Sequence, residues 1–397
     1  MRDREVLYVG AFVRSLATSL IGVLLGIYLA KLHFAPAEVG LVVGVGLAGA
    51  AVAALLVTLA GDRVGRRRAL ISLAILGALG AGIVALSSRV VIVAGAAFLG
   101  MLNGMGRDRS ASSILDQAIL PATSSHQRRT LGFAWYNVAQ DSGHALGALL
   151  AGAPLVLRHW LKVEELASLR FVIGGYALLL LLTAAIYSRL SYAVEAEPCA
   201  RALPLSDTSR QGLWKISALF GLDSVAGGFL TSSLLAFFFF QRFGATEGVV
   251  GLLFFGARVA NAASHLAAAW LSKRIGLVKT MVFTHIPSSI LLVTVAFAPN
   301  FPVAAVLFLL REGLVEMDVP TRQSYVMAMV RSQERTFASG ITNLVRLGGW
   351  ALAPSFAGLL MQGTSLAAPL FVGAGMKISY DLLLYRAFRR VKPPEET

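Results

Sequence analysis

The chain has 397 residues, of which 56% are hydrophobic and 14% are charged, and its net charge is +14. A mean hydropathy of +0.72 is too high for a surface that faces water, which excludes a soluble globular protein. Apolar runs of about 20 residues recur along the sequence, and each is long enough to cross about 30 Å of hydrocarbon as a helix. We therefore predict an all-α protein embedded in a lipid bilayer.

The basic residues follow a topological pattern. A net charge of this size would suit a nucleic-acid-binding protein, because phosphate contacts need clustered lysine and arginine. Here the basic residues gather in alternate loops between the apolar runs, as at 63–68, 128–129 and 273–279. The positive-inside rule places such loops in the cytoplasm. We therefore predict that both termini are cytoplasmic and that nucleic acid is not a partner.

Several kinds of chemistry are excluded by what the sequence lacks. Cys199 is the one cysteine, so disulfides and cysteine-based metal sites are not expected. No Gly-x-x-x-x-Gly-Lys-Ser/Thr motif is present, which argues against ATP as the energy source. The histidines His144, His265 and His285 stand singly among apolar residues, which favours packing or hydrogen bonding over metal binding. We predict no cofactor and no metal.

In chain order, the apolar runs predict twelve transmembrane helices in two bundles. The first six are expected at 7–31, 37–60, 69–86, 90–112, 130–153 and 170–190. A polar segment with two prolines then lacks a sustained apolar face and marks a boundary. The last six helices are expected at 213–240, 246–271, 280–298, 302–326, 336–361 and 366–389. The predicted parts are an N-terminal bundle at 1–190, a cytoplasmic linker at 191–212 and a C-terminal bundle at 213–397.

The two sets of helices also repeat one another in sequence. At one constant offset, identical residues recur: Gln117 and Gln323, Arg129 and Arg335, Asn137 and Asn343, Gly143 and Gly349, Gly152 and Gly358. At a slightly different offset, Arg14 and Ser15 fall on Asp223 and Ser224. Six helices in each half give both halves the same sidedness. The repeat is therefore expected to be parallel, about an axis normal to the membrane.

The most specific motif is the basic turn after the second predicted helix, Ala60-Gly61-Asp62-Arg63-Val64-Gly65-Arg66-Arg67-Arg68, which returns in weaker form at 272–279. This turn resembles the signature of the major facilitator superfamily, which runs approximately Gly-x-Leu-Ala-Asp-Arg-x-Gly-Arg-Lys. Its second part is matched by Asp62, Arg63, Gly65, Arg66 and Arg67. In its first part, Thr58 replaces a glycine and Gly61 replaces an alanine.

The resemblance implies a monomeric secondary transporter of a bacterial cytoplasmic membrane, with two six-helix bundles that rock around a midplane site for a small-molecule substrate. The resemblance places the chain near the drug/proton antiporter branch. Gly143, Gly147 and Gly152 match the family's antiporter signature only in part, however, and Ala148 in place of its proline argues against drug/proton antiport. In the resembled family the basic turn latches onto neighbouring helix ends when the inner gate closes. The gate residues expected here are Asp62, Arg63, Gly65, Arg66, Asp108 and Asp318.

Charged side chains within the predicted spans are candidates for the transport pathway, because an ionisable group near the bilayer centre costs several kcal/mol. The acids expected to exchange protons are Asp223, Asp141 and Glu312. The residues expected to bind substrate are Arg14, Asn137, Gln140, Arg258, Asn343 and Arg346. Arg14 is one possible partner for Asp223. An alternative role for all these charges is a set of buried salt bridges that hold helices together.

We predict proton-coupled transport of a small organic solute, with export favoured over uptake. An alternative is uptake, exchange or facilitated movement of an anionic metabolite, because arginines at the midplane could bind carboxylate or phosphate. An intramembrane enzyme that uses Asp141 and His144 is disfavoured, since no nucleophile or metal-binding group accompanies them. A sensor or scaffold is disfavoured by the lack of an output domain in the sequence.

Overall fold

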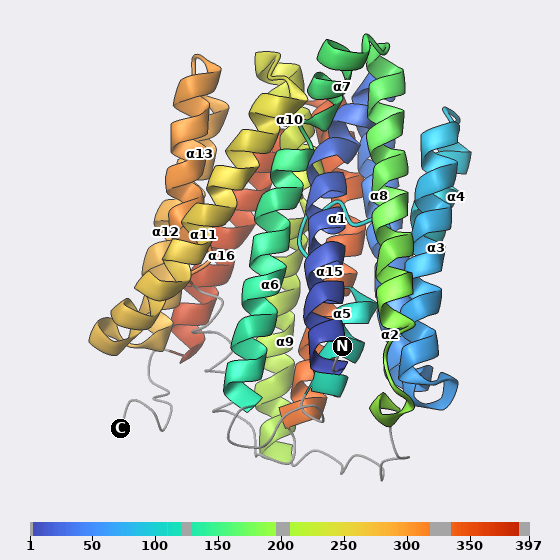
Figure 1. The fold of residues 1–397 in the computed structure, drawn as a ribbon. Coiled ribbons are helices and arrows are strands. Elements are labelled where there is room, and N and C mark those ends of the chain that lie inside the picture. The colour runs from blue at the N-terminus through green and yellow to red at the C-terminus, as the bar shows by residue number, and fades with distance from the viewer. Residues whose placement is uncertain (1–2, 109, 121–128, 196–206, 318–334, 389–397) are drawn as a thin grey trace. The chain divides into compact units, whose positions relative to one another are not determined.

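A computed structural model describes residues 3–108, 110–120, 129–195, 207–317 and 335–388 (Figure 1). All the regular structure in these ranges is helical. The elements are α1 (Asp3–Lys31), α2 (Pro36–Val64), α3 (Arg66–Leu86), α4 (Val90–Leu99), α5 (Ala111–Ile119), α6 (Arg129–Leu150), α7 (Ala153–Leu161), α8 (Glu165–Tyr187), the 3-10 helix η3 (Tyr192–Val194), α9 (Asp207–Gly228), α10 (Ser232–Phe243), α11 (Glu247–Ile275), α12 (Leu277–Ala296), α13 (Phe301–Val315), α15 (Arg335–Gly363) and α16 (Ala368–Phe388).

Seven apolar stretches of the described residues are long enough to cross a membrane as helices. They are Asp3–Lys31, Pro36–Gly61, Arg66–Leu86, Glu165–Tyr187, Ser217–Phe243, Val278–Ala296 and Leu344–Gly363. Within a continuous helix every interior backbone group is hydrogen-bonded, which is the condition for crossing hydrocarbon. The prediction of an all-α membrane protein is therefore confirmed.

The expectation of one continuous helix at 90–112 is wrong. The helix α4 ends at Leu99, and helical structure resumes with α5 at Ala111. The intervening segment contains three glycines, and Met101 and Gly106 have positive φ angles of 52° and 67°. The Asn103 side chain accepts a hydrogen bond from the Met105 backbone and donates one to the Arg107 carbonyl, at 2.9 and 2.7 Å. These local bonds compete with the helical ones and stabilise the break.

The expected helix at 213–240 is also broken, into α9 and α10, because the chain leaves helical geometry after the glycine pair Gly227–Gly228. The α10 helix begins with Thr231 as its N-cap, whose hydroxyl accepts a hydrogen bond from the Leu234 backbone at 3.2 Å. The α13 helix ends at Val315 and a turn follows at 316–317, whereas residues 318–326 of the predicted helix lie outside the described residues. The remaining long helices begin and end within about five residues of their predicted bounds.

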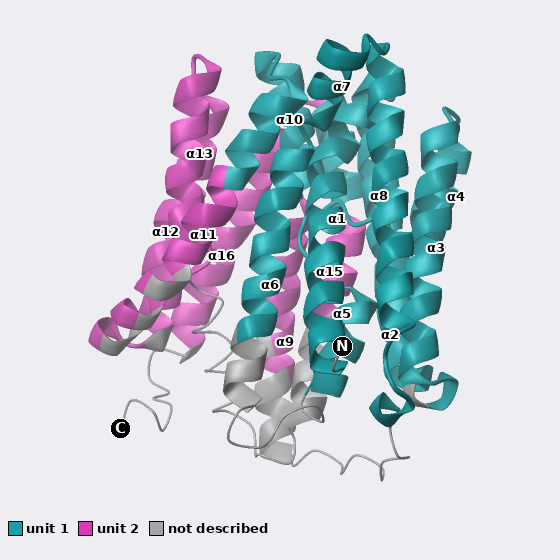
Figure 2. Cartoon of the chain, in the orientation of Figure 1, with its two compact units in different colours: residues 1–199, 231–255, 354–363 teal, residues 200–230, 256–353, 364–397 magenta. Residues whose placement is uncertain are grey.

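The contacts between Cα atoms divide the chain into two compact units (Figure 2). Unit 1 comprises 1–199, 231–255 and 354–363, and unit 2 comprises 200–230, 256–353 and 364–397. Unit 1 thus includes α10, the start of α11 and the end of α15, which all come from the predicted C-terminal bundle. The division into two six-helix bundles stays a prediction.

Glycine contacts follow the predicted repeat within each unit. In unit 1, a Cβ on Gly143 would lie 3.0 Å from the Cβ of Ser15, and in unit 2 a Cβ on Gly349 would lie 2.9 Å from the Cβ of Ser224. Gly143 is the repeat mate of Gly349, and Ser15 is that of Ser224. The same helix pair is therefore in close contact at the same position in both units, because glycine allows the backbones to approach.

Two further close contacts in unit 1 join pairs of glycines. A Cβ built on Gly152 would lie 3.0 Å from the Cα of Gly248, and one built on Gly358 would lie 2.9 Å from the Cα of Gly40. Gly152 and Gly358 are repeat mates. These contacts bring α11 against the turn between α6 and α7, and α15 against α2. We call them the two glycine crossings.

Candidate functional site

Arg14 on α1 is the centre of a buried polar cluster in unit 1. Its Nε donates to Asp108 Oδ2 at 2.6 Å, and its Nη2 donates to Asp116 Oδ2 at 2.8 Å. Arg14, Asp108 and Asp116 are 5%, 6% and 0% exposed. Removal of these three charges from water is offset only if they pair and hydrogen-bond one another. We call Arg14, Asp108, Asp116, Tyr136, Gln140 and Tyr187 the Arg14 cluster.

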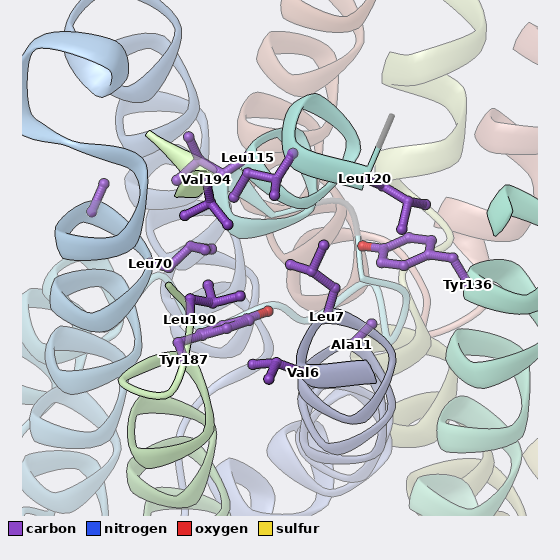
Figure 3. Packing of buried hydrophobic residues seen from close by; sticks show 12 residues of the cluster. Val6, Leu7, Ala11, Leu70, Leu115, Leu120, Tyr136, Tyr187, Leu190 and Val194 are labelled. Atoms are coloured by element: carbon purple, nitrogen blue, oxygen red, sulfur yellow. The ribbon is translucent and has the colours of Figure 1, made fainter. Parts of the chain in front are cut away.

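Two tyrosines close the Arg14 cluster from neighbouring helices. The hydroxyls of Tyr136 on α6 and Tyr187 on α8 lie 3.0 and 3.1 Å from Asp116 Oδ2, and both accept hydrogen bonds from Arg14. Their rings belong to a hydrophobic core that also includes Leu7 and Leu115 (Figure 3). In this view the two hydroxyls point toward each other across the core. The apolar rings keep water away from the charges, which strengthens the ionic contacts.

Asp108 receives further hydrogen bonds because the segment between α4 and α5 is not helical. Its Oδ1 accepts from Ser110 Oγ at 2.7 Å, and its Oδ2 accepts from Gln140 Nε2 at 3.2 Å. Its backbone N–H donates to Nε2 of His144 at 2.8 Å. Gln140, predicted as a substrate residue, thus contacts the cluster directly. The predicted gate residue Asp108 lies in the buried cluster with Arg14, and no described contact joins it to the basic turn.

The two carboxylate oxygens of Asp116 differ in their hydrogen bonding. Its Oδ2 is shared by Arg14, Tyr136 and Tyr187, whereas its Oδ1 is buried without a hydrogen-bond partner among the described residues. A buried polar atom in this condition is rare and costly, and it calls for an explanation such as the binding of a proton or an ion. The sequence analysis did not select Asp116, because it follows the predicted end of the fourth helix.

A second buried chain of charges lies in unit 2. Lys377 on α16 donates to Asp223 Oδ1 on α9 at 3.1 Å, and its Nζ lies 3.3 Å from Nε2 of His285 on α12. The other ring nitrogen of His285 lies 3.0 Å from Asp381 Oδ1. All four side chains are at most 8% exposed. We call this run of Asp223, Lys377, His285 and Asp381 the unit 2 relay.

The positions of protons in the unit 2 relay follow from its geometry. A protonated Lys377 has three donors and no lone pair, so the nearby His285 Nε2 must accept. His285 Nδ1 then carries the ring's proton and donates to Asp381. One ammonium faces two carboxylates, and Asp381 Oδ2 is buried with no hydrogen-bond partner in the described part of the chain. The relay therefore has room for an added proton at that oxygen.

The partners of Arg14 and Asp223 differ from the predicted one. Each of these repeat mates pairs within its own unit, Arg14 with the two carboxylates and Asp223 with Lys377. Lys377 and Asp381 are functional candidates that the sequence analysis missed. Both lie within the predicted span 366–389, so the rule that marks intramembrane charges as functional applies to them. The sequence analysis predicted packing or hydrogen bonding for His285, and the structure places it within hydrogen-bond distance of two charged groups.

Glu312 on α13 pairs with the adjacent Arg311 and accepts a hydrogen bond from Asn261 Nδ2 at 3.0 Å. Arg346 lies over the Trp350 ring, with 4.9 Å between the guanidinium carbon and the ring centroid. Arg258 is half-buried on α11. These residues lie in unit 2. The structure therefore gives Glu312 a charged partner but does not assign it a role in proton exchange.

Asn137 and Asp141 lie exposed on α6. The side chains of Asp62, Asn343 and Asp318 lie outside the described residues, so the roles predicted for them stay predictions. The described residues contain no group of histidine, cysteine, aspartate or glutamate side chains suited to hold a metal ion.

The basic turn is capped by an acid that the sequence analysis did not select. Gly65 has a φ of 96°, which lets the chain turn directly from α2 into α3. The carboxylate of Glu195 then accepts hydrogen bonds from the backbone N–H groups of Arg66 and Arg67, at 2.5 and 3.4 Å. An anion at a helix N-terminus is favourable because the first N–H groups have no helical partner. Arg63 is exposed.

The chain is similar to a yeast membrane protein and to solved transporter structures over nearly its whole length. The uncharacterized membrane protein YJR124C of Saccharomyces cerevisiae is 24% identical over 417 residues, which cover 96% of this chain and 93% of that protein. The solved structure of the nucleoside transporter NupG matches with a TM-score of 0.75 at 14% identity, over 98% of this chain and 100% of that chain. The human organic anion transporter MFSD10 matches with a TM-score of 0.60 at 17% identity, over 96% and 99%.

The family assignment rests on a sequence match as well as on the fold. The all-helical architecture and the apolar spans agree with the structural matches, which at these identities show the fold alone. The family model of the Major Facilitator Superfamily matches residues 7–240 and 216–397. Because these matches cover almost the entire chain, the protein is a member of the Major Facilitator Superfamily and a membrane transporter.

Proposed function

We propose that the protein is a secondary active transporter that couples proton movement to the export of a small organic solute across a bacterial cytoplasmic membrane. Alternating access around a site near the midplane of the bilayer is the mode of transport in this proposal. The single observation that supports proton coupling best is the unit 2 relay. Buried ionisable groups in membrane spans are costly, and a relay of carboxylate, amine and imidazole groups provides sites where a proton can bind and leave.

The relay suggests how a proton changes the preferred conformation. When Asp223 is ionised, it neutralises the ammonium of Lys377, and the pair is stable in a dry environment. When Asp223 is protonated, Lys377 loses its direct ion-pair partner and keeps the neutral His285 as a hydrogen-bond partner, with the carboxylate of Asp381 on the other side of the His285 ring. A buried ammonium whose direct partner has been neutralised is strongly disfavoured. Proton binding therefore favours a conformation in which Lys377 finds a new partner or water, which is a population shift driven by the proton.

The proposed substrate class rests on similarity to other transporters. Matched structures include the nucleoside transporter NupG, a POT family peptide transporter and the organic anion transporter MFSD10. A thermal-shift panel of nucleosides, dipeptides and organic anions is the first experiment, because a ligand that binds the folded state raises the melting temperature by mass action. The compound that gives the largest shift is then the probe for transport.

The anionic metabolite remains the alternative substrate. The Arg14 cluster argues against Arg14 as its binding site, because two carboxylates already surround the guanidinium. Arg258 and Arg346 are the remaining candidates from the predicted set. If organic anions alone shift the melting temperature, and Arg346→Gln removes that shift, the alternative replaces the favoured substrate class.

The coupling test uses purified protein in liposomes with the probe compound. Asp223→Asn, which mimics the protonated acid, is expected to abolish accumulation driven by a pH gradient and to retain exchange of substrate down its own gradient. Glu164→Gln is the matched control, because Glu164 is an exposed acid. Normal gradient-driven accumulation in Asp223→Asn would remove Asp223 from the mechanism and leave Asp141 and Glu312 as the predicted acids. If every variant transports without any effect of the pH gradient, proton coupling itself is refuted.

A further inference from the structure

The broken segment between α4 and α5 is bound to the start of α10 within unit 1. The backbone N–H of Ser233 donates to the Gly104 carbonyl at 3.0 Å, and its hydroxyl donates to the Gly22 carbonyl on α1 at 2.8 Å. The hydroxyl of Ser232 donates to the Met105 carbonyl at 2.8 Å. The bonds to Gly104 and Met105 satisfy backbone carbonyls that lie outside any helix, which irregular backbone at membrane depth requires.

The segment also fits tightly against α1. A Cβ on Gly22 would lie 2.3 Å from the Cα of Gly106, so the two backbones are in direct contact. The Asn103 side chain bonds to backbone groups on both sides of this contact. Residues 103–108 therefore have little freedom to move independently of one another, and we call them the linking segment.

The linking segment ends in the Arg14 cluster. Asp108 lies three residues after Met105, and its carboxylate accepts the hydrogen bond from Arg14 Nε. One end of the segment is thus held by a charge, and the other end binds the hydroxyls of α10. A change in the electrostatic attraction between Arg14 and Asp108 therefore has to pass through only a few residues of tightly packed backbone to reach the contacts with α10.

The charges around Arg14 do not balance. Nε2 of His144 accepts a hydrogen bond from the Asp108 N–H, so the His144 ring is neutral. The guanidinium of Arg14 therefore faces two carboxylates, and the net charge of the Arg14 cluster is −1. Among the described residues, the other titratable groups that face it are tyrosines on α6 and α8, namely Tyr136, Tyr187 and Tyr176, and the linking segment itself carries the charge of Arg107. The charged residues of α2 and α3, which also pack on α5, lie at helix ends: Glu38, Asp62, Arg63, Arg66, Arg67 and Arg68.

We propose that Asp116 is a proton-binding site, with the proton on its buried and unpartnered Oδ1, and that the bound proton tightens the hold of the linking segment on α10. An incoming hydronium ion supplies the proton, and the new O–H bond makes the carboxyl neutral. The net charge of the Arg14 cluster is then zero. This site lies in unit 1 and is separate from the relay on which the proposed function rests.

The direction of the effect follows from competition for one cation. When Asp116 is ionised, its Oδ2 shares the guanidinium of Arg14 with Asp108. When Asp116 is protonated, Asp108 becomes the sole anion paired with Arg14, and their attraction is no longer divided. Asp108 is then held more firmly, and so are the carbonyls of Gly104 and Met105 that bind α10. Loss of the proton loosens the same contacts.

Infrared spectroscopy tests the proton site, because a protonated carboxyl group has a carbonyl band distinct from that of a carboxylate. We expect purified wild-type protein to show such a band that titrates with pH, and we expect Asp116→Asn to lose it. Glu164→Gln is the matched control, since Glu164 is an exposed acid outside both charge clusters and its replacement should leave this band in place. If no titrating band distinguishes Asp116→Asn from wild type, the proton site is refuted.

Cysteine labelling tests the link to α10. Met105→Cys in a Cys199→Ser background places the probe on the linking segment without removal of a described backbone hydrogen bond. Its maleimide labelling rate is divided by that of Ser88→Cys, an exposed site, to cancel the intrinsic effect of pH on thiols. We expect this ratio to rise several-fold as pH rises, and to stay low at every pH with Asp116→Asn.

The labelling outcomes are decisive in either direction. A ratio that does not change with pH in otherwise wild-type protein refutes the link to α10, and this measurement does not depend on whether Asp116→Asn folds. A pH dependence that persists unchanged in Asp116→Asn also refutes it. Failure of proton-driven transport would overturn the proposed function, but it would leave both of these measurements unaffected.

Discussion

Replacement of Arg14 by methionine is expected to be among the most damaging single changes in unit 1. Methionine is similar in length and apolar, so the change removes the charge and the donors without a large cavity. Asp108 and Asp116 would lose hydrogen bonds of 2.6 and 2.8 Å from a charged donor. Removal of one partner from a buried ion pair costs about 3–5 kcal/mol. Since two carboxylates lose the same partner, we expect the free energy of unfolding to fall by about 5 kcal/mol.

Reversible unfolding in mixed micelles, followed by tryptophan fluorescence, gives the free energy of unfolding for this test. Arg189→Met is the control, because Arg189 is exposed and its replacement should change the free energy by less than about 0.5 kcal/mol. The double variant Arg14→Met with Asp116→Asn should recover part of the loss, since one of the two unpaired charges is then gone.

Two results would refute this account of the Arg14 cluster. The first is a loss of less than about 1 kcal/mol in Arg14→Met, which is the range of an exposed ion pair. The second is strict additivity in the double variant, because residues that interact must show a coupling energy of at least about 0.5 kcal/mol. Either result would mean that the carboxylates do not depend on Arg14 for their stability.

The remaining predictions concern the basic turn and the packing of α1. Glu195→Gln should lower the free energy of unfolding by about 0.5–2 kcal/mol, since a charged acceptor is lost at the start of α3. Thermal melts should show that this loss of stability is smaller in high salt. An equal loss at all salt concentrations would contradict a charge effect. Gly22→Ala should lower the free energy by about 1–3 kcal/mol through its clash with Gly106, as measured by unfolding in mixed micelles. Gly82→Ala is its control, because a Cβ there meets nothing within 4 Å, and equal stability of the two alanine variants would refute the packing argument.

The fold was predictable because its determinants are local in sequence. Apolar runs of membrane-spanning length, the basic turn at Asp62–Arg68 and the internal repeat each point to the same architecture, and the family match confirms it. The breaks in the helices at Gly100 and Gly228 were harder to predict, because glycine is common inside membrane helices. What decides between a continuous and a broken helix is the set of partners for the freed backbone groups, such as Ser233, and these come from distant parts of the chain.

The site was predictable only in part. The rule for buried charges selected Arg14 and Asp223, and both lie in buried ionic clusters. Their partners could not be deduced, because Asp108 reaches Arg14 through irregular backbone that the sequence analysis treated as a helix end. The repeat suggested that Arg14 and Asp223 might pair with each other, but a repeat relates equivalent positions and does not bring them into contact. The roles of these residues in transport stay predictions.

The glycine crossing of Gly40 with Gly358 has a kinetic consequence. There α2 and α15 meet through backbone atoms, whereas the side chain of Leu155 lies in the contact of Gly152 with Gly248. Side chains that interdigitate must change rotamers before they separate and must find them again before they rejoin, whereas bare backbone surfaces need neither step. Contact between α2 and α15 at this point can therefore be broken and remade without a change of side-chain rotamers.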